Sequence, residues 1–463
     1  MLCIDECGTR CISWQKERSK MNTIFTGLKK IIPLHIFFLF QPFYHFFMAW
    51  LAAVFYGFPS RKLIVIGVTG TKGKTTVVEL LHEIFASTDV RVASLSSLQF
   101  RVGNKEERNM RKMTMPGRFF IQKFLHRARR AGCKYVVLEV TSEGIKQFRH
   151  RFIKFDAVAL TNVSPEHIEA HGNFEKYVRA KLDLFWRLAK DGVALINLDD
   201  PNWQRFAAAT ASHKLFYGRD EIVNGSVRYK IDDIKIQDSG ISFDIGGVSF
   251  NSPLLGEFNF YNILAAVSLG LSQHIPLEKM AIVIPSVLGI PGRMEFIQKE
   301  PFAVVVDYAH TPDSLRNVYT FLRGNPKSEI RNPKLICVLG SAGGGRDSWK
   351  RSEFGKIAAE FCDETILTNE DPYDENPQSI IDEIASGFSQ STKRKAQSAK
   401  KILDRREAIL EALKSAKPGD TVLITGKGAE PWIMGPKGEK IPWDDREIVR
   451  GELEKLKKAP LGP

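Results

Sequence analysis

Cysteine is scarce in this chain, and its distribution argues against two classes of protein. The 463 residues contain six cysteines, and none of them form the closely spaced pairs that hold structural zinc. Cys3, Cys7 and Cys11 recur every four residues and would share one face of a helix, but a metal site there is not our preferred interpretation. The sequence also shows no cleavable secretory signal. We therefore expect a protein of the reduced cytoplasmic compartment rather than a secreted protein or one stabilised by structural zinc.

Charged residues are missing from one long stretch near the N-terminus. Between Ile31 and Phe58 there is no Lys, Arg, Asp or Glu, and Phe, Leu and Ile are abundant. The stretch is long enough to cross a bilayer, but Pro33 and Pro42 interrupt it. Basic pairs flank both of its ends, which argues against a single span. Two interpretations stay open: a monotopic or hairpin contact of residues 31–58 with the cytosolic face of a membrane, or an apolar helix pair docked on this protein or on a partner.

Acidic residues are outnumbered by basic ones, 53 to 66, which gives a formal net charge of +13. No nucleic-acid recognition motif accompanies this excess, so it predicts anionic substrates and no nucleic-acid partner. The hydrophobic content of 43% and the charged content of 26% are typical of a folded, soluble protein. A chain of this length is expected to form two or three domains.

The most informative segment is residues 65–76, Val-Ile-Gly-Val-Thr-Gly-Thr-Lys-Gly-Lys-Thr-Thr. An apolar β-branched run, a glycine-rich turn and a helical pattern follow one another, as in a strand, a phosphate loop and a helix. Gly70 and Gly73 allow the backbone to close around phosphate oxygens, Lys74 can reach the β- and γ-phosphates, and the Thr75 hydroxyl can bind Mg²⁺. The spacing is one residue shorter than the common Walker form. The segment predicts ATP binding by Gly70, Thr71, Lys72, Gly73, Lys74, Thr75 and Thr76.

The order of apolar runs and amphipathic patterns predicts an α/β fold. Strands at 135–140, 157–161 and 193–197 alternate with helices at 118–131, 174–189 and 259–271, which indicates a doubly wound domain. Residues 215–255 alternate apolar and polar positions and are interpreted as a small antiparallel insertion. Ile290-Pro291-Gly292 marks a boundary, and a second unit has strands at 303–307, 335–340, 364–368 and 421–425. We predict a short apolar helical segment (1–60), a central P-loop ATPase domain (61–290) and a Rossmann-like C-terminal domain (291–463).

Polar residues after the predicted strands are candidates for metal binding. Glu139 ends a strand and would hold Mg²⁺ or act as a helix cap. His167 follows the next strand and is either a second ligand or a solvated loop residue, whereas His171 is interpreted as structural. Lys181 lies in an amphipathic helical pattern, where a lysine is usually a surface residue. The residues alone leave these alternatives open.

Taken in order, the motifs of the chain resemble those of one enzyme family. Beside the phosphate loop they include Glu139-Val-Thr-Ser, Thr161-Asn-Val-Ser-Pro-Glu-His, His171-Gly-Asn-Phe-Glu-Lys, Gly256-Glu-Phe-Asn, Gly292-Arg-Met-Glu, Asp307-Tyr-Ala-His-Thr-Pro-Asp and Gly426-Lys-Gly-Ala-Glu. They resemble the Mur ligases, the ATP-dependent amide-forming enzymes of peptidoglycan precursor synthesis. The similarity covers roughly residues 63–450 and is greatest to the branch that adds the third residue, the UDP-N-acetylmuramoyl-tripeptide synthetases. The family's N-terminal uridine-binding domain is not matched, and residues 31–58 stand in its place, so UDP recognition is not implied.

The resemblance implies roles around the nucleotide. Thr75, Glu139 and His167 would hold Mg²⁺, and Lys181 matches a lysine that CO₂ converts to a carbamate able to hold a second Mg²⁺. The catalytic set would be Lys74, Glu139, His167, Lys181, Arg293 and His310. Further contacts to ATP would come from Asn162, Asn259, Asn262, Arg293, Asp307 and His310.

The resemblance also implies substrate contacts. Thr114, Met115, Thr141, Gln147 and Arg149 would line the muramoyl-peptide, and the incoming amino acid would meet Arg346, Glu370, Asp371, Pro372, Tyr373, Gly426 and Glu430. Tyr373 stands where diaminopimelate-adding relatives carry an arginine, and tyrosine cannot replace a guanidinium that pairs with a carboxylate. Diaminopimelate is therefore not supported, and lysine or another amino acid stays open.

The implied reaction has two steps. A substrate carboxylate attacks the γ-phosphate of ATP and becomes an acyl-phosphate, and the amine of a free amino acid then displaces the phosphate. A monomeric, cytoplasmic ligase is expected. One alternative is a related ligase for a folate or poly-amino-acid substrate, and another is a non-catalytic, nucleotide-binding membrane partner.

Overall fold

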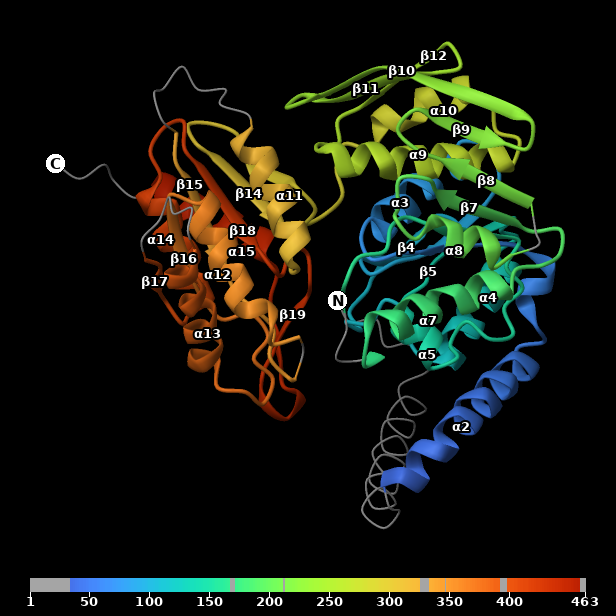
Figure 1. Cartoon of the computed structure of the whole chain (residues 1–463), viewed down its shortest axis with the longest axis horizontal. Coiled ribbons are helices and arrows are strands. Elements are labelled where there is room, and N and C mark those ends of the chain that lie inside the picture. Colours follow the sequence, from blue (N-terminus) through green and yellow to red (C-terminus); the bar gives the residue numbers. More distant parts are fainter. Residues whose placement is uncertain are drawn as a thin grey trace, which may run out of the picture.

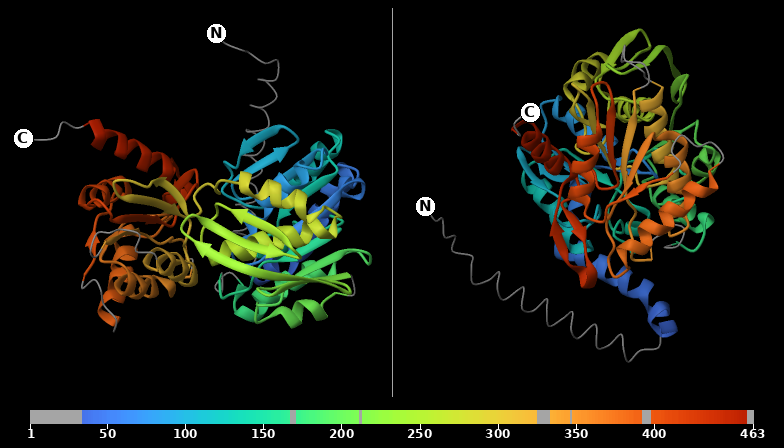
Figure 2. Two further views of the ribbon diagram at one scale, coloured as in Figure 1. Left: turned by 90° about the horizontal axis from the view of Figure 1, so that it is seen from above. Right: turned by 90° about the vertical axis from the view of Figure 1, so that its left-hand side faces the viewer.

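The computed structural model describes residues 34–166, 171–210, 213–324, 333–345, 347–391 and 398–458. Two α/β domains lie side by side in Figure 1 and in the left-hand view of Figure 2, and the chain passes between them once, after α10 (Leu277–Val283). A separate helix, α2 (Leu34–Phe55), extends from the lower side of the first domain (Figure 1).

The central domain is built on a twelve-stranded sheet with the order β12-β11-β10-β9-β8-β7-β6-β1-β5-β2-β3-β4. Strands β2, β5, β1, β6, β7 and β8 run parallel to one another, so their carboxyl ends meet at one edge. The strands are β1 (Ile64–Thr69), β2 (Val92–Leu95), β3 (Gln99–Val102), β4 (Lys105–Arg108), β5 (Tyr135–Glu139), β6 (Ala157–Leu160), β7 (Val193–Asn197), β8 (His213–Tyr217), β9 (Glu221–Asn224), β10 (Val227–Gln237), β11 (Gly240–Ile245) and β12 (Val248–Ser252).

Helices cover both faces of this sheet. Strand β1 shows why: Ile66 and Val68 point to the side of α3 (Lys74–Ala86) and α9 (Glu257–Ser272), whereas Val65 points to the opposite core. That opposite face is covered by α4 (Arg118–Arg130) and α7 (Phe174–Trp186), with the shorter α5 (Ser142–Lys146) and α8 (Trp203–Ala208) nearby. The predicted doubly wound domain is confirmed.

The predicted antiparallel insertion needs one correction. Strands β9 to β12 are antiparallel as expected, but they do not form a separate unit. Strand β8 pairs in parallel with β7 along Val193–Asn197, and β9 then pairs with β8. The segment therefore extends the central sheet, because β7 offers an open edge that the sequence pattern does not reveal.

The C-terminal domain holds a six-stranded sheet with the order β13-β14-β18-β15-β16-β17, parallel except for the edge strand β13. Helices α11 to α13 pack on one face and α14 and α15 on the other. Its elements are β13 (Glu295–Gln298), β14 (Ala303–Asp307), α11 (Pro312–Arg323), β15 (Leu335–Leu339), α12 (Lys350–Phe361), β16 (Glu364–Leu367), α13 (Pro377–Gln390), β17 (Lys400–Lys401), α14 (Arg405–Ser415), β18 (Thr421–Thr425), β19 (Trp432–Met434), β20 (Lys440–Pro442) and α15 (Asp445–Lys458).

Two of the cysteines are paired. Cys337 of β15 and Cys362, directly after α12, form a disulfide, while Cys133 is free and buried. This pair was not expected, because the cysteine pattern predicted a protein of a reduced compartment. The packing of α12 against β15 brings the two residues together, and a separation of 25 residues in sequence gives no sign of it.

Helix α2 is a single helix with Pro42 inside it. Its small residues Ala49, Ala52 and Ala53 are buried, and the helix packs against α4. Within the part of the chain that the structure describes, no helix is both long enough and apolar enough to cross a membrane.

Candidate active site

The phosphate loop lies between β1 and α3, at the carboxyl edge of the central sheet. Gly73 caps α3 with a φ of 81°, and a Cβ at this position would lie 2.1 Å from Asn262 Oδ1. A Cβ on Gly70 would lie 1.9 Å from Thr161 Oγ1. Lys74 Nζ donates to the carbonyl oxygens of Gly70 and Thr71 at 3.0 and 2.8 Å, so the lysine lies along the loop. The loop therefore has the shape that phosphate binding requires.

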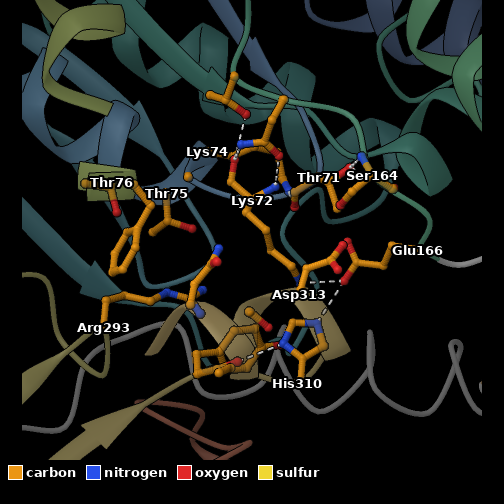
Figure 3. Close-up of a pocket in the computed structure, with 18 of the residues that line it drawn as sticks. Thr71, Lys72, Lys74, Thr75, Thr76, Ser164, Glu166, Arg293, His310 and Asp313 are labelled. Atoms are coloured by element: carbon orange, nitrogen blue, oxygen red, sulfur yellow. Dashed lines mark hydrogen bonds and ion pairs between the residues drawn. The ribbon is translucent and has the colours of Figure 1, made fainter. Parts of the chain in front are cut away.

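One carboxylate links this loop to the C-terminal domain. Glu166 Oε1 accepts from Lys72 Nζ at 2.8 Å and lies 3.0 Å from His310 Nε2. Figure 3 shows the Lys72 and His310 side chains both reaching the carboxylate of Glu166. Burial, followed by the charge of Lys72, lowers the pKa of His310 to about 4, so its imidazole is neutral at physiological pH. Glu166 was not among the predicted site residues.

Two of the predicted magnesium ligands lie together. Glu139 Oε2 accepts from Thr75 Oγ1 at 3.0 Å and from the Ser97 backbone N–H at 2.8 Å. These oxygen donors suit Mg²⁺, which usually takes one or two protein ligands and completes its shell with water and phosphate oxygens. His167 lies outside the described residues. Among those described, no group of three His, Cys, Asp or Glu side chains could hold a metal.

Lys181 is not the surface residue that its helical pattern permitted. It lies on α7, is 1% exposed, and its Nζ donates to the Gly70 carbonyl at 2.8 Å. The nitrogen also lies 4.4 Å from the centre of the Tyr177 ring. Burial, followed by the charge of Lys74, lowers the pKa of Lys181 well below its usual value. The interpretation of Lys181 as a surface residue is therefore wrong, and its amine lies against the phosphate loop at Gly70.

The other residues predicted to contact ATP line one cavity of about 790 Å³, together with the phosphate loop. Asn262 Nδ2 donates to Asn259 Oδ1 at 2.9 Å on α9, and Asn162 Oδ1 accepts from the Lys72 N–H at 2.9 Å. From the other domain, the Arg293 guanidinium lies 4.0 Å from the centre of the Tyr308 ring. Asp307 accepts the N–H groups of Met294 and Ala309, each at 2.7 Å, and so fixes the turn that carries these residues.

A second cavity of about 590 Å³ adjoins the first and holds the predicted muramoyl-peptide residues Met115, Gln147 and Arg149. Arg149 Nη2 donates to Gln147 Oε1 at 2.6 Å. Several residues line both cavities: Ser97, Thr114, Thr141, Arg293, Tyr308, Asp347 and Glu430. The two cavities are therefore neighbouring parts of one site.

A cluster of buried charged residues lies where the free amino acid is predicted to bind. Lys427 Nζ donates to Asp371 Oδ1 at 2.9 Å and to Glu430 Oε2 at 2.6 Å. Lys112, from the central domain, pairs with Asp371 and lies 3.3 Å from Glu430. Burial opposes ionisation of Glu430, but Lys427 and Lys112 outweigh it and lower its pKa to about 2.

Glu370 differs from these paired carboxylates. It is buried, lines the first cavity beside Gly426, and its Oε2 has no hydrogen-bond partner among the described residues. Burial, followed by the charge of Asp371, raises its pKa. Pro372 and Tyr373 are not among the described residues that line the two cavities, although the Tyr373 ring lies 6.0 Å from Lys112 Nζ. Arg346 lies outside the described residues.

Comparison with known proteins agrees with this geometry. The family model of the Mur ligase middle domain matches residues 68–270, and that of the Mur ligase glutamate ligase domain matches residues 292–428. The UDP-N-acetylmuramoyl-L-alanyl-D-glutamate–2,6-diaminopimelate ligase of Thermosynechococcus vestitus is 37% identical over 420 residues, which cover 89% of this chain and 81% of that protein. This chain belongs to the Mur ligase family.

Two further relatives support this assignment. A UDP-N-acetylmuramyl-tripeptide synthetase of Roseiflexus sp. is 35% identical over 428 residues, covering 88% of this chain and 82% of that protein. A solved structure of a UDP-N-acetylmuramoyl-L-alanyl-D-glutamate–2,6-diaminopimelate ligase is 30% identical and gives a TM-score of 0.56, covering 86% of this chain and 79% of that one. The predicted family, the α/β fold and the class of ATP- and Mg²⁺-dependent, ADP-forming amide ligases in peptidoglycan precursor synthesis are confirmed.

The site of this Mur ligase also contains residues that the motifs did not reveal. Glu166, through His310, and Lys112, through Asp371, each connect the two domains, and Ser97 holds Glu139 through its backbone. Lys350 lines the first cavity and donates to the His310 carbonyl at 3.3 Å. Glu166 was visible within a quoted motif, but no sequence pattern pairs Lys112 with residues more than 250 positions away.

Proposed function

We propose that this Mur ligase joins the free carboxylate of a muramoyl-peptide to the amine of a free amino acid, with release of ADP and phosphate. The observation that carries this proposal is the adjacency of two cavities between the domains. One holds the phosphate loop, the other holds Gln147 and Arg149, and Arg293 and Glu430 line both. A carboxylate and a nucleotide phosphate can therefore meet at their junction.

The residues of the chain account for the steps of the reaction. Lys74 and the loop amides hold the β- and γ-phosphates while the acceptor carboxylate takes up the γ-phosphoryl group. The amine of the amino acid then forms the amide bond as phosphate leaves the resulting acyl-phosphate. Contacts between the domains, such as that of Lys72 and His310 with Glu166, would hold the site closed against water.

Mg²⁺ would be held by Thr75 and Glu139, and when bound it neutralises charge on the transferring phosphoryl group. We further propose that Lys181 carries a carbamate. Its nitrogen is buried beside the phosphate loop, and burial lowers its pKa, which favours the neutral amine that can attack CO₂. The product, with loss of one proton, is an anion in place of an amine and could serve a second Mg²⁺.

For the amino acid, we propose that selection of diaminopimelate over lysine is weak. Position 373 carries tyrosine rather than a guanidinium, which leaves a distal carboxylate without a two-pronged partner. The unpaired Glu370 Oε2 could instead accept hydrogen bonds from an incoming ammonium group.

We also propose that α2 brings this monomeric, cytoplasmic enzyme to the cytosolic face of a membrane. Its outward side exposes large apolar residues, with Phe43 and Phe55 70% and 72% exposed. No Asp or Glu occurs from residue 34 to residue 78, while Arg61 and Lys62 are exposed beside the helix. An apolar face with basic flanks suits an anionic lipid surface that the helix lies on without crossing.

The function is tested by measuring ADP release from the purified full chain with a panel of amino acids, each with and without a muramoyl-dipeptide acceptor. Release that requires both substrates and disappears in Lys74→Ala is expected. Release with a folate acceptor instead would favour the alternative ligase, and nucleotide binding without any release would favour the non-catalytic alternative. Membrane contact is tested by fractionating full-length protein beside a chain starting at Ser60, because only the former should sediment with vesicles.

A further inference from the structure

Two arginines share Gln147 as a hydrogen-bond partner: Arg118, which contacts α2 at His45, and Arg149, which lines the second cavity. Arg118, the first residue of α4, donates from Nε and Nη2 to the Gln147 carbonyl at 3.0 and 2.6 Å and also contacts His45 of α2. Arg149 donates to the side chain of the same Gln147 at 2.6 Å and to the Met115 carbonyl. Both guanidinium groups therefore contact the same residue.

Within the described part of the chain neither arginine forms an ion pair, although the charge of Glu143, which lines the same cavity, acts on Arg149. Arg118 and Arg149 donate to carbonyl groups and make no ion pair there, whereas other arginines of this domain do, such as Arg187 with Asp183 at 2.8 Å. Burial, followed by the charge of Arg149, lowers the pKa of Arg118. In addition, the Arg149 Nε is buried and has no hydrogen-bond partner among the described residues. Two partly buried guanidinium groups that form no ion pair in the described residues are a good receptor for a doubly charged anion.

The surroundings indicate what that anion is attached to. On one side, Arg149 lines the cavity that also holds Thr114 and Thr141 at the edge of the phosphate loop site. On the other side, α2 extends away from the domain below α5 (Figure 1), and its outward aromatic residues are exposed. A ligand bound at the two arginines thus has one end in the ligase cavity and the other along an apolar helix.

We propose that Arg118 and Arg149 bind the diphosphate of a lipid-linked muramoyl-peptide, which rests on the proposed ligase function and on the membrane contact of α2. The sugar and peptide would enter the cavity past Arg149, and the hydrocarbon chain would leave past His45 along α2. Phe43 and Phe55, each more than two-thirds exposed, offer contact to a hydrocarbon chain. They offer no hydrogen-bond partners to a ribose or a uracil.

The binding test uses full-length protein and three kinds of phosphatidylcholine vesicle: neutral, with phosphatidylglycerol, and with a polyprenyl diphosphate at matched surface charge. Wild type should bind the diphosphate vesicles about tenfold more tightly than the phosphatidylglycerol vesicles, as expected for charge-assisted contacts to a defined group. Arg118→Gln should lose this preference and keep the binding to phosphatidylglycerol. Arg228→Gln, which removes an exposed arginine of β10, is the matched control and should behave as wild type.

Several results would overturn the proposal: equal binding to the two anionic vesicles, an undiminished preference in Arg118→Gln, or no vesicle binding at all. Thermal unfolding verifies that the variant is folded. If it is not, Arg118→Lys takes its place, since it keeps the charge but not the two-pronged geometry and should show an intermediate preference.

The activity test compares ADP release with a polyprenyl-diphosphate-linked and a UDP-linked muramoyl-dipeptide. Wild type should favour the lipid-linked acceptor in kcat/KM by about tenfold, and Arg118→Gln should remove that advantage. A preference for the UDP-linked acceptor would overturn the proposal. Absence of release with both acceptors would instead refute the ligase function, while the vesicle measurements would still decide the phosphate site.

Discussion

Replacing Lys181 by methionine separates a catalytic role from a structural one. In its unmodified form the Lys181 side chain makes one hydrogen bond, to the Gly70 carbonyl at 2.8 Å, and that oxygen keeps a second donor in Lys74 at 3.0 Å. Losing one such bond costs about 0.5–1.5 kcal/mol, and burying methionine in place of an amine offsets part of this. We therefore expect the free energy of unfolding of Lys181→Met to change by no more than about 1.5 kcal/mol.

The effect on turnover should be much larger. If Lys181 carries the carbamate, its removal deletes an anion beside the transferring phosphoryl group, and losses of at least about 10²-fold in kcat are typical of such groups. ADP release and denaturant unfolding are measured on the same preparations. Lys176→Met, an exposed position on the same helix, is the matched control and should keep full activity.

Chemical rescue makes the test specific. Small carboxylates added to Lys181→Met should restore part of the activity, because they can occupy the space of the missing carbamate. If Lys181→Met works within about threefold of the wild-type rate, the methionine side chain suffices and the catalytic assignment is refuted.

Three other predictions follow from the site. Gly73→Ala places a methyl group 2.1 Å from Asn262 Oδ1 at a φ of 81°, so ATP affinity should fall at least about tenfold; unchanged affinity in a nucleotide titration would refute the loop assignment. Tyr373→Arg should raise the use of diaminopimelate relative to lysine in competition assays, and a wild-type enzyme already selective for diaminopimelate would contradict the argument. His310 has a folded pKa of about 4 against 6.5 unfolded, so the unfolded state binds the proton first as the pH falls. Stability should therefore decrease between about pH 6.5 and 4, and His310→Gln should reduce that decrease in thermal unfolding curves; equal slopes would contradict it.

Much of the nucleotide half of the site could be predicted from the sequence, because its elements are local. The phosphate loop needs a strand, two glycines and a helix within a dozen residues, and all of them appear where the motif placed them. Glu139 likewise lies next to Thr75, because the carboxyl ends of parallel strands share one edge of the sheet.

The remainder depended on contacts between distant segments. The helical pattern around Lys181 is that of a surface lysine, and it could not show that the side chain lies against the phosphate loop. Lys112 reaches Asp371 only because the domains approach each other, and β8 extends the central sheet only because β7 leaves its edge open. The Arg118 and Arg149 pair also joins two elements that share no motif.

The central claim is that this chain activates a carboxylate by phosphorylation and then forms an amide. The most direct measurement uses a muramoyl-dipeptide whose reactive carboxylate carries a heavy-oxygen label, with ATP, Mg²⁺ and an accepted amino acid. An acyl-phosphate route transfers one labelled oxygen to the released phosphate, and mass spectrometry should find it there in a one-to-one ratio with amide product. Amide formed with unlabelled phosphate would contradict the account.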